Sequence, residues 1–282
     1  MNILVTGSSS YVGKYIILGL LSLGHKVVGT SRTDPKIKNK NFIWISHDLS
    51  LSPLEALKVN IEVIVHVAGL AWYGRPVVDY VNSNINTTMN LEIMIKNIKP
   101  FVTFYTSSRD IYGEIEVSQI KENTSIINPI VYAHTKFIAE QILLESSSTI
   151  IFRLPSVIGI GTHGWIDSIY KKLIKNEDIE FINTKFNNFI HASELPLIVD
   201  KFIKKSIFKT DLYLLGCSNI IYSKTLISRM KILLDSKSIL IENKDKKKSY
   251  TISVKKINKV YKTMTVEESI DKYIREMQTL KD

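Results

Sequence analysis

The first 154 residues alternate short runs of β-branched and aromatic residues with longer stretches whose apolar residues recur at helical spacing. This rhythm is typical of βαβ units, which place parallel strands in one sheet and helices on both of its faces. We therefore predict an α/β fold with a doubly wound parallel sheet. The expected strands begin at Asn2, Lys26, Phe42, Val63, Phe101 and Thr149, and the expected helices span residues 12–23, 81–97 and 132–146.

The pattern changes after Pro155, where shorter elements replace the regular alternation. Helical stretches are expected to begin at Trp165, Ser223 and Val266, and one more strand is expected in the sequence LYLLG. Open α/β sheets bind ligands outside the carboxyl ends of their strands, so a small second lobe is expected to close over that edge. We predict a large sheet domain of residues 1–162 and 187–216, and a small lobe of residues 163–186 and 217–282.

The composition argues against several classes of protein. Hydrophobic residues make up 45% of the chain, which is enough for a folded core, and no stretch approaches the roughly 20 apolar residues of a membrane span. The chain begins in a strand pattern without the features of a signal peptide, and its single Cys217 can form no internal disulfide. We therefore expect a cytoplasmic protein with no membrane contact.

The net charge of +10 comes mainly from 31 lysines spread along the chain, beside only six arginines. Dispersed lysines do not form the basic patch that binds nucleic acid, so we expect no nucleic-acid partner. His, Cys, Asp and Glu residues show no spacing typical of metal ligands, so we also expect no metal site.

The stretch VTGSSSYVGK, from Val5 to Lys14, joins the first strand to the first helix. Gly7, Ser10 and Gly13 have the spacing of a glycine-rich phosphate loop in which serine replaces the middle glycine. A serine hydroxyl can still donate to a phosphate oxygen beside the amino terminus of the helix. The loop therefore predicts a dinucleotide cofactor, with an ordinary tight turn as the alternative.

The residues after the second and third strands bear on which dinucleotide is bound. An acidic residue after the second strand would accept hydrogen bonds from the ribose of NAD, but this chain has Ser31 and Arg32 there. A guanidinium suits a 2′-phosphate, so we predict NADP, while Asp34 keeps NAD possible. Asp48 follows the third strand and is expected either to accept from the adenine amine or to cap a helix.

Tyr132 and Lys136 lie four residues apart, which places both side chains on one face of the helix after the fifth strand. A phenol with a pKa near 10 is a poor acid or base at neutral pH, but a nearby ammonium and the nicotinamide charge favour the phenolate. We predict that Tyr132 transfers a proton and that Lys136 tunes it and holds the nicotinamide ribose. Ser108, at the end of the fifth strand, is expected to bind the substrate oxygen, with Ser107 as the alternative.

Eight stretches of the chain occur in an order that resembles the extended short-chain dehydrogenase/reductase family, the NAD(P)-dependent epimerase/dehydratase group. They are TGSSSYVG, DLS, VHVAG, NSNINTTMNLE, SSRDIYG, YAHTK, RLPSVIG and NNFIHASEL. The resemblance implies that the large domain is a Rossmann-type NAD(P)-binding domain and the small carboxy-terminal lobe binds substrate. It also implies that Ser108, Tyr132 and Lys136 are catalytic.

The resemblance extends to the residues that contact ligands. It implies that Val12, Ala68 and Val157 contact the cofactor and that Asn84 lies near it. With the residues argued above, the expected cofactor-binding set is Gly7, Ser10, Tyr11, Val12, Gly13, Arg32, Asp48, Leu49, Ala68, Asn84, Tyr132, Lys136 and Val157. The expected substrate-binding residues are Ser108, Arg109 and Ser156.

The chain departs from the family at positions that concern the substrate. Many nucleotide-sugar members carry asparagine where this chain has Ser156 and arginine where it has Asn187, and use both on the diphosphate. We expect another basic residue, Arg75, Lys185 or Arg229, to replace them. Thr87 stands where the family helix has a glycine, and its added bulk is expected to be accommodated by local repacking.

These features together predict an NADP-preferring oxidoreductase that reduces a 4-keto (deoxy)sugar attached to a nucleotide by hydride transfer. The alternatives are an NAD-dependent nucleotide-sugar 4-epimerase, a reductase of a non-sugar ketone and, in another class, a non-catalytic NAD(P)-binding sensor. In the family, the helices expected at residues 81–97 and 132–146 pair across a two-fold axis into a four-helix bundle. A homodimer is therefore expected.

Overall fold

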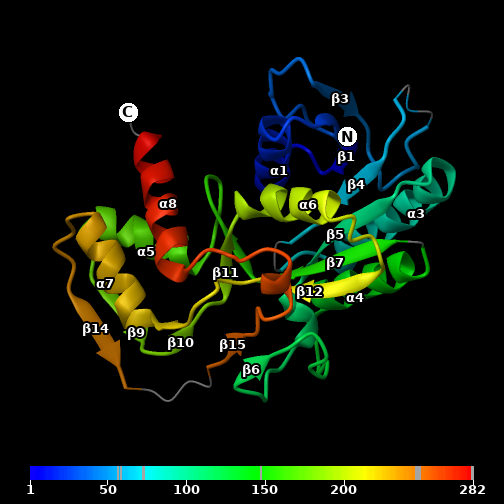
Figure 1. The fold of residues 1–282 in the computed structure, drawn as a ribbon. Helices are drawn as coiled ribbons and strands as arrows, with labels where there is room; N and C mark the ends of the chain where they lie inside the picture. Colours follow the sequence, from blue (N-terminus) through cyan, green and yellow to red (C-terminus); the bar gives the residue numbers. More distant parts are fainter. Residues whose placement is uncertain (56, 58, 72–73, 147, 245–248, 281–282) are drawn as a thin grey trace. The chain divides into compact units, whose positions relative to one another are not determined.

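The computed structural model describes the chain from residue 1 to residue 280, apart from residues 56, 58, 72–73, 147 and 245–248. Its contacts divide it into two compact units (Figure 1). The first unit comprises Met1–Glu114, Thr124–Arg153 and Leu195–Tyr213, and the second comprises Ile115–Asn123, Leu154–Glu194 and Leu214–Asp282.

The boundaries differ in detail from those expected from the sequence. Residues 115–123, 154–162, 187–194 and 214–216 were expected in the large sheet domain, but their contacts assign them to the second unit. The reason is local pairing: Ser156–Ile158 forms a parallel ladder with Phe189–His191, and Ile158 and Phe189 both belong to the core of the second unit.

The first unit contains the parallel strands and the flanking helices of a Rossmann-type domain. Its strands are β1 (Asn2–Thr6), β2 (Lys26–Ser31), β3 (Phe42–Ser46), β4 (Val63–His66), β5 (Val102–Ser108), β7 (Thr149–Leu154) and β12 (Asp211–Leu214). Its helical segments are α1 (Tyr11–Ser22), α2 (Val77–Tyr80), η1 (Val81–Asn86), α3 (Thr87–Ile98), η2 (Arg109–Tyr112), α4 (Val131–Leu144) and α6 (Glu194–Lys204).

The strands of the first unit form one seven-stranded sheet in the order β12-β7-β5-β4-β1-β2-β3. The pairs β1–β2, β1–β4, β2–β3 and β4–β5 are parallel, and the register places Ile3 opposite both Val27 and Val63. The strand order reverses between β1 and β4, which is the switch point where such sheets bind ligands at their carboxyl edge. The predicted doubly wound sheet is confirmed, and all six strands expected in the first half are present.

Helices cover both faces of this sheet, and β5 illustrates how. All seven residues of β5 are buried. Phe104 stacks edge-on with Phe202 of α6, so α6 packs on the face to which Phe104 points. Tyr105, the next residue, belongs to a core with Leu91 of α3 and Leu143 of α4, so these helices cover the opposite face. The alternation of side chains along a strand accounts for this division.

The helix expected at residues 81–97 begins with a π-helical segment, η1 (Val81–Asn86), and continues as α3 (Thr87–Ile98). Thr87, which stands at the family's glycine position, is buried at this junction. Its hydroxyl donates to the carbonyl of Asn82, five residues earlier, at 3.1 Å. The added side chain is therefore accommodated by a hydrogen bond within a widened helical turn.

The second unit is built from short strands and three longer helices. Its strands are β6 (Gln119–Ile120), β8 (Ser156–Ile158), β9 (Ile179–Ile182), β10 (Lys185–Phe186), β11 (Phe189–His191), β13 (Ile221–Tyr222), β14 (Leu240–Asn243) and β15 (Thr251–Ile252). Its helices are α5 (Trp165–Ile174), α7 (Ser223–Leu233), η3 (Ile257–Lys259) and α8 (Val266–Thr279).

The core of the second unit lies among its three longer helices and its short ladders. Leu173 of α5, Leu226 of α7 and Ile270 of α8 are fully buried in it. The strands pair only in twos, as β8–β11, β9–β14, β10–β13 and β6–β15. In the part of the chain that the structure describes, no helix has the length and apolarity needed to cross a membrane.

Candidate cofactor and catalytic site

The turn between β1 and α1 requires glycine at two positions. Gly7 has φ of 69°, and a Cβ there would lie 2.7 Å from the backbone nitrogen of Ala68, just beyond β4. A Cβ at Gly13 would collide with the carbonyl oxygen of Gly7. The two glycines thus let β1, α1 and the segment after β4 approach closely, which is the geometry of a pyrophosphate-binding turn.

Ser10 is bonded within the loop. Its hydroxyl accepts a hydrogen bond from the backbone nitrogen of Gly13 at 3.0 Å and donates to the carbonyl oxygen of Gly7 at 2.8 Å. The expected contact of Ser10 with a phosphate oxygen stays a prediction. Ser10 is the N-cap of α1, and it closes the turn as a side-chain clip.

The carboxyl ends of β2 and β3 form a small polar network. The hydroxyls of Ser8 and Ser31 lie 2.6 Å apart, and the indole nitrogen of Trp44 donates to Ser31 at 3.2 Å. Arg32 is exposed, and its guanidinium lies 3.9 Å from the carboxylate of Asp48. Ser31 therefore takes the place of the carboxylate that would accept from a ribose, and Arg32 stands beside it with its charge available to a ligand.

Asp48 caps a turn. One carboxylate oxygen accepts from the backbone nitrogen of Ser50 at 3.0 Å and from its hydroxyl at 2.6 Å, and these hydrogen bonds lower the pKa of Asp48. Of the two roles that the sequence left open, the structure contains a capping contact, made to a turn in place of a helix. The neighbouring Leu49 is buried in the core against α3 and α4.

A chain of buried hydrogen bonds links β1 to α4 beneath the carboxyl edge of the sheet. The hydroxyl of Thr6 lies 2.7 Å from Nδ1 of His66, whose Nε2 lies 3.2 Å from the hydroxyl of Thr88. Thr88 donates to the carbonyl of Asn84 at 2.6 Å, and the amide of Asn84 donates to the hydroxyl of Thr135 at 2.9 Å. This network fixes Asn84 between the segment after β4 and the helix that carries Tyr132 and Lys136.

Ser108 and Tyr132 meet at the carboxyl edge of the sheet. Tyr132 is buried near the start of α4, and burial raises the pKa of its phenol to about 12. A hydrogen bond with Ser108 lowers the pKa, and the nearby carboxylate of Asp110 raises it. Ser108 also accepts from the backbone nitrogen of Asp110 at 3.1 Å, which fixes its hydroxyl at the end of β5.

Lys136 lies one helical turn after Tyr132 and is 5% exposed. Burial lowers the pKa of its amine to about 7, and the carboxylate of Glu140 opposes that shift. A Cβ at Gly69 would lie 3.6 Å from the Lys136 amine and 2.8 Å from Oδ1 of Asn84, so glycine keeps the space beside these two groups open. The amine is thus placed at the segment that follows β4.

The sequence predicts that the ammonium of Lys136 and the charge of a nicotinamide together favour the Tyr132 phenolate, and this stays a prediction for the protein with its cofactor. In the protein alone, the pKa of Tyr132 is raised. The cause is desolvation, which disfavours the phenolate more than the surrounding charges and hydrogen bonds favour it.

A buried ion pair supports the helix behind the site, and the sequence analysis missed it. Glu140, one turn after Lys136, is fully buried and receives two hydrogen bonds from Arg153, at 3.0 and 2.6 Å. The Arg153 guanidinium lies 4.8 Å from the centre of the Tyr112 ring. The spacing of residues 132, 136 and 140 places Glu140 on the helical face of the other two, but it does not identify Arg153 as its partner.

The other predicted site residues of the first unit have different surroundings. Ser107 is buried and its hydroxyl has no hydrogen-bond partner among the described residues, whereas Ser108 contacts Tyr132, so the structure favours Ser108. Arg109 pairs with the adjacent Asp110 at 3.1 Å. Tyr11 and Val12 lie in the first turn of α1, at the glycine-rich loop.

The substrate candidates of the second unit have varied surroundings. Ser156 is exposed and Val157 is buried, both on β8. Asn187 is buried, and its amide donates to the carbonyls of Cys217 and Ile252, while its Oδ1 accepts from the Ile252 nitrogen. The residue that replaces the family's arginine is therefore part of the core of this unit.

The three basic residues considered as replacements also differ. Arg229 makes a two-point ion pair with Asp271, which occupies its guanidinium. Arg75 and Lys185 are exposed.

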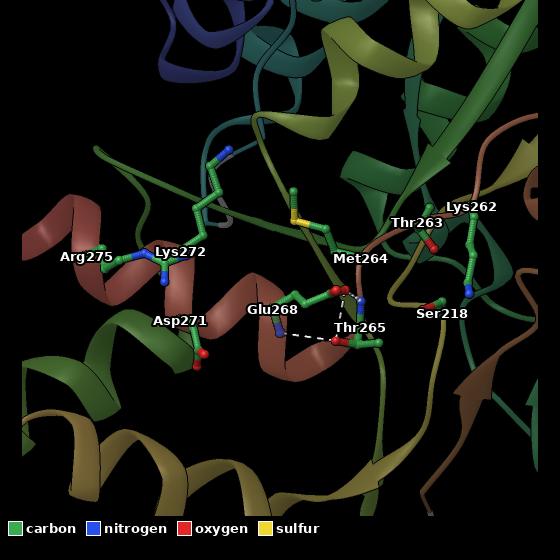
Figure 2. A pocket seen from close by; sticks show the side chains of 9 residues that line it. All are labelled: Ser218, Lys262, Thr263, Met264, Thr265, Glu268, Asp271, Lys272 and Arg275. Atoms are coloured by element: carbon green, nitrogen blue, oxygen red, sulfur yellow. Dashed lines mark hydrogen bonds between the residues drawn. The ribbon is translucent and has the colours of Figure 1, made fainter.

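A cavity of about 560 Å³ lies at the start of α8 in the second unit, and sequence reasoning did not find it. Figure 2 shows Lys262 at one end and Lys272 and Arg275 at the other. Between them, Glu268 closes a capping box with Thr265, so its carboxylate is engaged within α8. The cations do not converge on one point, so the cavity does not form a single anion site.

The geometry of the first unit fits a dinucleotide. The turn at Gly7 and Gly13 is a cradle that a Cβ would fill, and buried Ser107 keeps a hydroxyl without a partner among the described residues. A buried amine and a buried phenol stand at the same edge of the sheet. Within the described part of the chain, no cluster of three His, Cys, Asp or Glu residues is placed to hold a metal ion.

Comparisons with known proteins agree with this geometry. The model of the NAD dependent epimerase/dehydratase family matches residues 3–208. UDP-glucose 4-epimerase of Yersinia enterocolitica is 29% identical over 168 residues, which cover 52% of this chain and 49% of that protein. CDP-abequose synthase of Salmonella muenchen is 25% identical over 218 residues, which cover 72% of this chain and 70% of that protein.

Among solved structures, UDP-glucuronic acid 4-epimerase from Bacillus cereus in complex with NAD superimposes with a TM-score of 0.83 at 19% identity. That comparison covers 100% of both chains and establishes the shared fold. The sequence match to the UDP-glucose 4-epimerase, by contrast, spans about half of that protein's length.

Proposed function

Because the chain belongs to the NAD-dependent epimerase/dehydratase family, we propose that it is an oxidoreductase acting on a nucleotide-linked sugar with a bound nicotinamide dinucleotide. The observation that carries this proposal is the contact between Ser108 and Tyr132 at the carboxyl edge of the sheet, one helical turn before buried Lys136. The relatives support the substrate class, since their names contain UDP-glucose, CDP-abequose and UDP-glucuronic acid.

The residues of the first unit divide the work of holding the cofactor. Gly7 and Gly13 would leave room for the pyrophosphate, and the first turn of α1 would supply backbone N–H donors to it. Lys136 would donate hydrogen bonds to the nicotinamide ribose, in the space that Gly69 keeps open. When bound, the nicotinamide would donate a hydride to the sugar carbon that bears the reacting oxygen, or accept a hydride from it.

Tyr132 is the group that moves the proton. In the direction of reduction, its phenol is protonated at neutral pH, since burial raises a pKa that is already well above 7, and it donates that proton to the carbonyl oxygen. Ser108 hydrogen-bonds the same oxygen as negative charge develops on it. In the direction of oxidation, Tyr132 accepts the hydroxyl proton, and a charged Lys136 one turn away lowers the cost of the phenolate.

For the reaction itself we propose interconversion at the 4-position of the sugar. A 4-epimerase would use both directions of the reaction at one position: the proton leaves and returns at the oxygen, and a hydride leaves the carbon and returns to its opposite face. Substrate and product therefore differ only in the configuration of that carbon. The match to UDP-glucose 4-epimerase favours this reaction.

A second candidate is reduction of a 4-keto sugar with NADPH, and one observation favours it. Ser31 stands where a carboxylate would bind the ribose of NAD, and exposed Arg32 beside it suits a 2′-phosphate. NADPH is the usual donor for reductive synthesis, so a preference for NADP would support the reductase.

The cofactor and the direction can be tested together. The purified protein is denatured and the released dinucleotide identified, and separate samples are incubated with UDP-glucose or with NADPH and a 4-keto nucleotide sugar. Tightly held NAD and formation of UDP-galactose without added cofactor support the epimerase. Consumption of NADPH with the keto sugar supports the reductase. If bound cofactor is found but neither substrate is converted, both enzymatic proposals fail and a cofactor-binding sensor is favoured. If an activity is found and Tyr132→Phe leaves it unchanged, the role given to Tyr132 fails.

We further propose that the protein forms a homodimer through α3 and α4. Met89 and Ile93 of α3 and Ile138 of α4 are between 43% and 52% exposed, so both helices carry apolar residues on their outer faces. Two copies of this helix pair would bury these residues in a four-helix bundle. A mass of one chain in light scattering at micromolar concentration would refute the dimer.

A further inference from the structure

The ring of Tyr105 supports the amine of Lys136. The Lys136 nitrogen lies 4.3 Å from the centre of the ring, which is well within the range of a cation–π contact. The same ring stacks on the imidazole of His66, with the ring centres 5.4 Å apart and the planes inclined by 22°. Tyr105 is 1% exposed, so both contacts take place away from water.

The amine of Lys136 lies against the ring of Tyr105 in a side chain that is 5% exposed. The hydroxyl of Tyr105 is buried without a hydrogen-bond partner in the described part of the chain. It is therefore the face of the ring, and not its hydroxyl, that Tyr105 offers to the site.

We propose that Tyr105 is a positioning residue, whose ring holds the buried Lys136 amine in place and stabilises its charged form before any cofactor is bound. This inference goes deeper into the proposed function and rests on it for the role of Lys136. Burial disfavours the charged form of an amine, and the negative face of an aromatic ring offsets part of that cost. The ring of Tyr105 thus lies between the imidazole of His66 and the amine of Lys136 on α4 in the sense that it contacts both.

The other ionisable groups around the amine act together with the ring. On α4 itself, Glu140 favours the charged amine, and Tyr132 lies one turn away. From β4, His66 is buried, and burial together with the charge of Lys136 lowers the pKa of its imidazole to about 3. His66 is therefore neutral at physiological pH, so it does not repel the ammonium.

The test measures the titration of the amine directly, without cofactor or substrate. Lysine is labelled with ¹³C at Cε, and the Lys136 signal is assigned by its loss in Lys136→Met. In the wild-type protein this signal is expected to titrate near pH 7. Tyr105→Phe keeps the ring and removes only the unpartnered hydroxyl, so its signal is expected to titrate with the wild type.

Two variants weaken the ring's negative face. Tyr105→Leu removes the ring, and a trifluorinated phenylalanine at position 105 keeps the shape but withdraws charge from the face. Both are expected to shift the midpoint of Lys136 downward, by about one pH unit or more for Tyr105→Leu. Water admitted by the smaller leucine would shift the midpoint upward, so the sign of the change separates the two effects.

Phe104→Leu is the matched control. Phe104 is the neighbouring buried aromatic residue of β5 and packs against the opposite face of the sheet. Its loss is expected to lower the melting temperature as Tyr105→Leu does, but to leave the titration of Lys136 unchanged.

The proposal is overturned if the fluorinated variant titrates with the wild type, or if Phe104→Leu shifts Lys136 as much as Tyr105→Leu does. The fluorinated variant decides the question even if Tyr105→Leu does not fold. The assays of the proposed function use the wild-type enzyme with sugar nucleotides, so the failure of one proposal is distinguishable from the failure of the other.

Discussion

Replacing Glu140 with glutamine tests how much the buried ion pair behind the site stabilises the fold. Glu140 is fully buried and Arg153 is 5% exposed, and the two are joined by two hydrogen bonds. Glu140→Gln leaves the guanidinium buried and without its counter-charge. Breaking such a pair from one side costs about 3–5 kcal/mol of unfolding free energy. For a chain of this size the melting temperature is expected to fall by about 6–20 °C.

The double variant Glu140→Leu/Arg153→Met is the control, because it removes both charges and keeps apolar volume. Its unfolding free energy is expected to lie within about 2 kcal/mol of the wild type, since replacing a whole buried pair is often neutral. Urea denaturation and differential scanning calorimetry measure both variants. A cost below about 1 kcal/mol for Glu140→Gln, or a double variant as unstable as the single one, would refute the argument.

Three further outcomes follow from the same structure. Gly13→Ala is expected to weaken NAD binding by about tenfold or more in calorimetry, because the new Cβ collides with the Gly7 carbonyl, whereas Gly164→Ala, with no atom within 4 Å of its Cβ, is expected to bind as the wild type. Ser10→Ala removes the N-cap of α1 and is expected to cost about 1 kcal/mol in urea denaturation, against a few tenths for Ser10→Gly. Burial lowers the pKa of His66 to about 3, so the unfolded chain binds that proton first. Stability is therefore expected to fall as pH drops from about 6.5 toward 3, by about 1.4 kcal/mol per pH unit, and His66→Gln removes this slope in denaturation curves across pH.

The sheet and the chemical groups of the site could be predicted because they depend on short patterns. Each strand of the first half is a compact apolar run, and Tyr132 and Lys136 share a helix at a spacing that fixes their common face. Ser108 is the last residue of a buried strand, so its place at the carboxyl edge follows from the direction of that strand. These inferences need only local periodicity and the geometry of parallel sheets.

The interactions that tune the groups could not be predicted, because they join distant parts of the chain. Nothing in the local sequence of Arg153 indicates that it pairs with Glu140 on another element. The clip made by Ser10 likewise depends on the close approach of Gly7 and Gly13, which only the folded turn provides. The hydrogen-bond donors of a loop can be identified from the sequence, but their acceptors depend on the folded conformation.

Desolvation dominates the electrostatics of the site in the protein without cofactor. Burial is the largest cause of the pKa shift for Tyr132, Lys136 and His66 alike. In each case burial favours the neutral form, so at neutral pH the phenol and the imidazole are uncharged and the amine is close to its midpoint. Small changes around the amine therefore have large effects on its charge. Removing the ring of Tyr105 would be such a change, because the ring lies against the amine and both side chains are almost completely buried. β5 thus supplies core residues to both faces of the sheet, and through Tyr105 it also affects the charge of the Lys136 amine at the edge of the sheet.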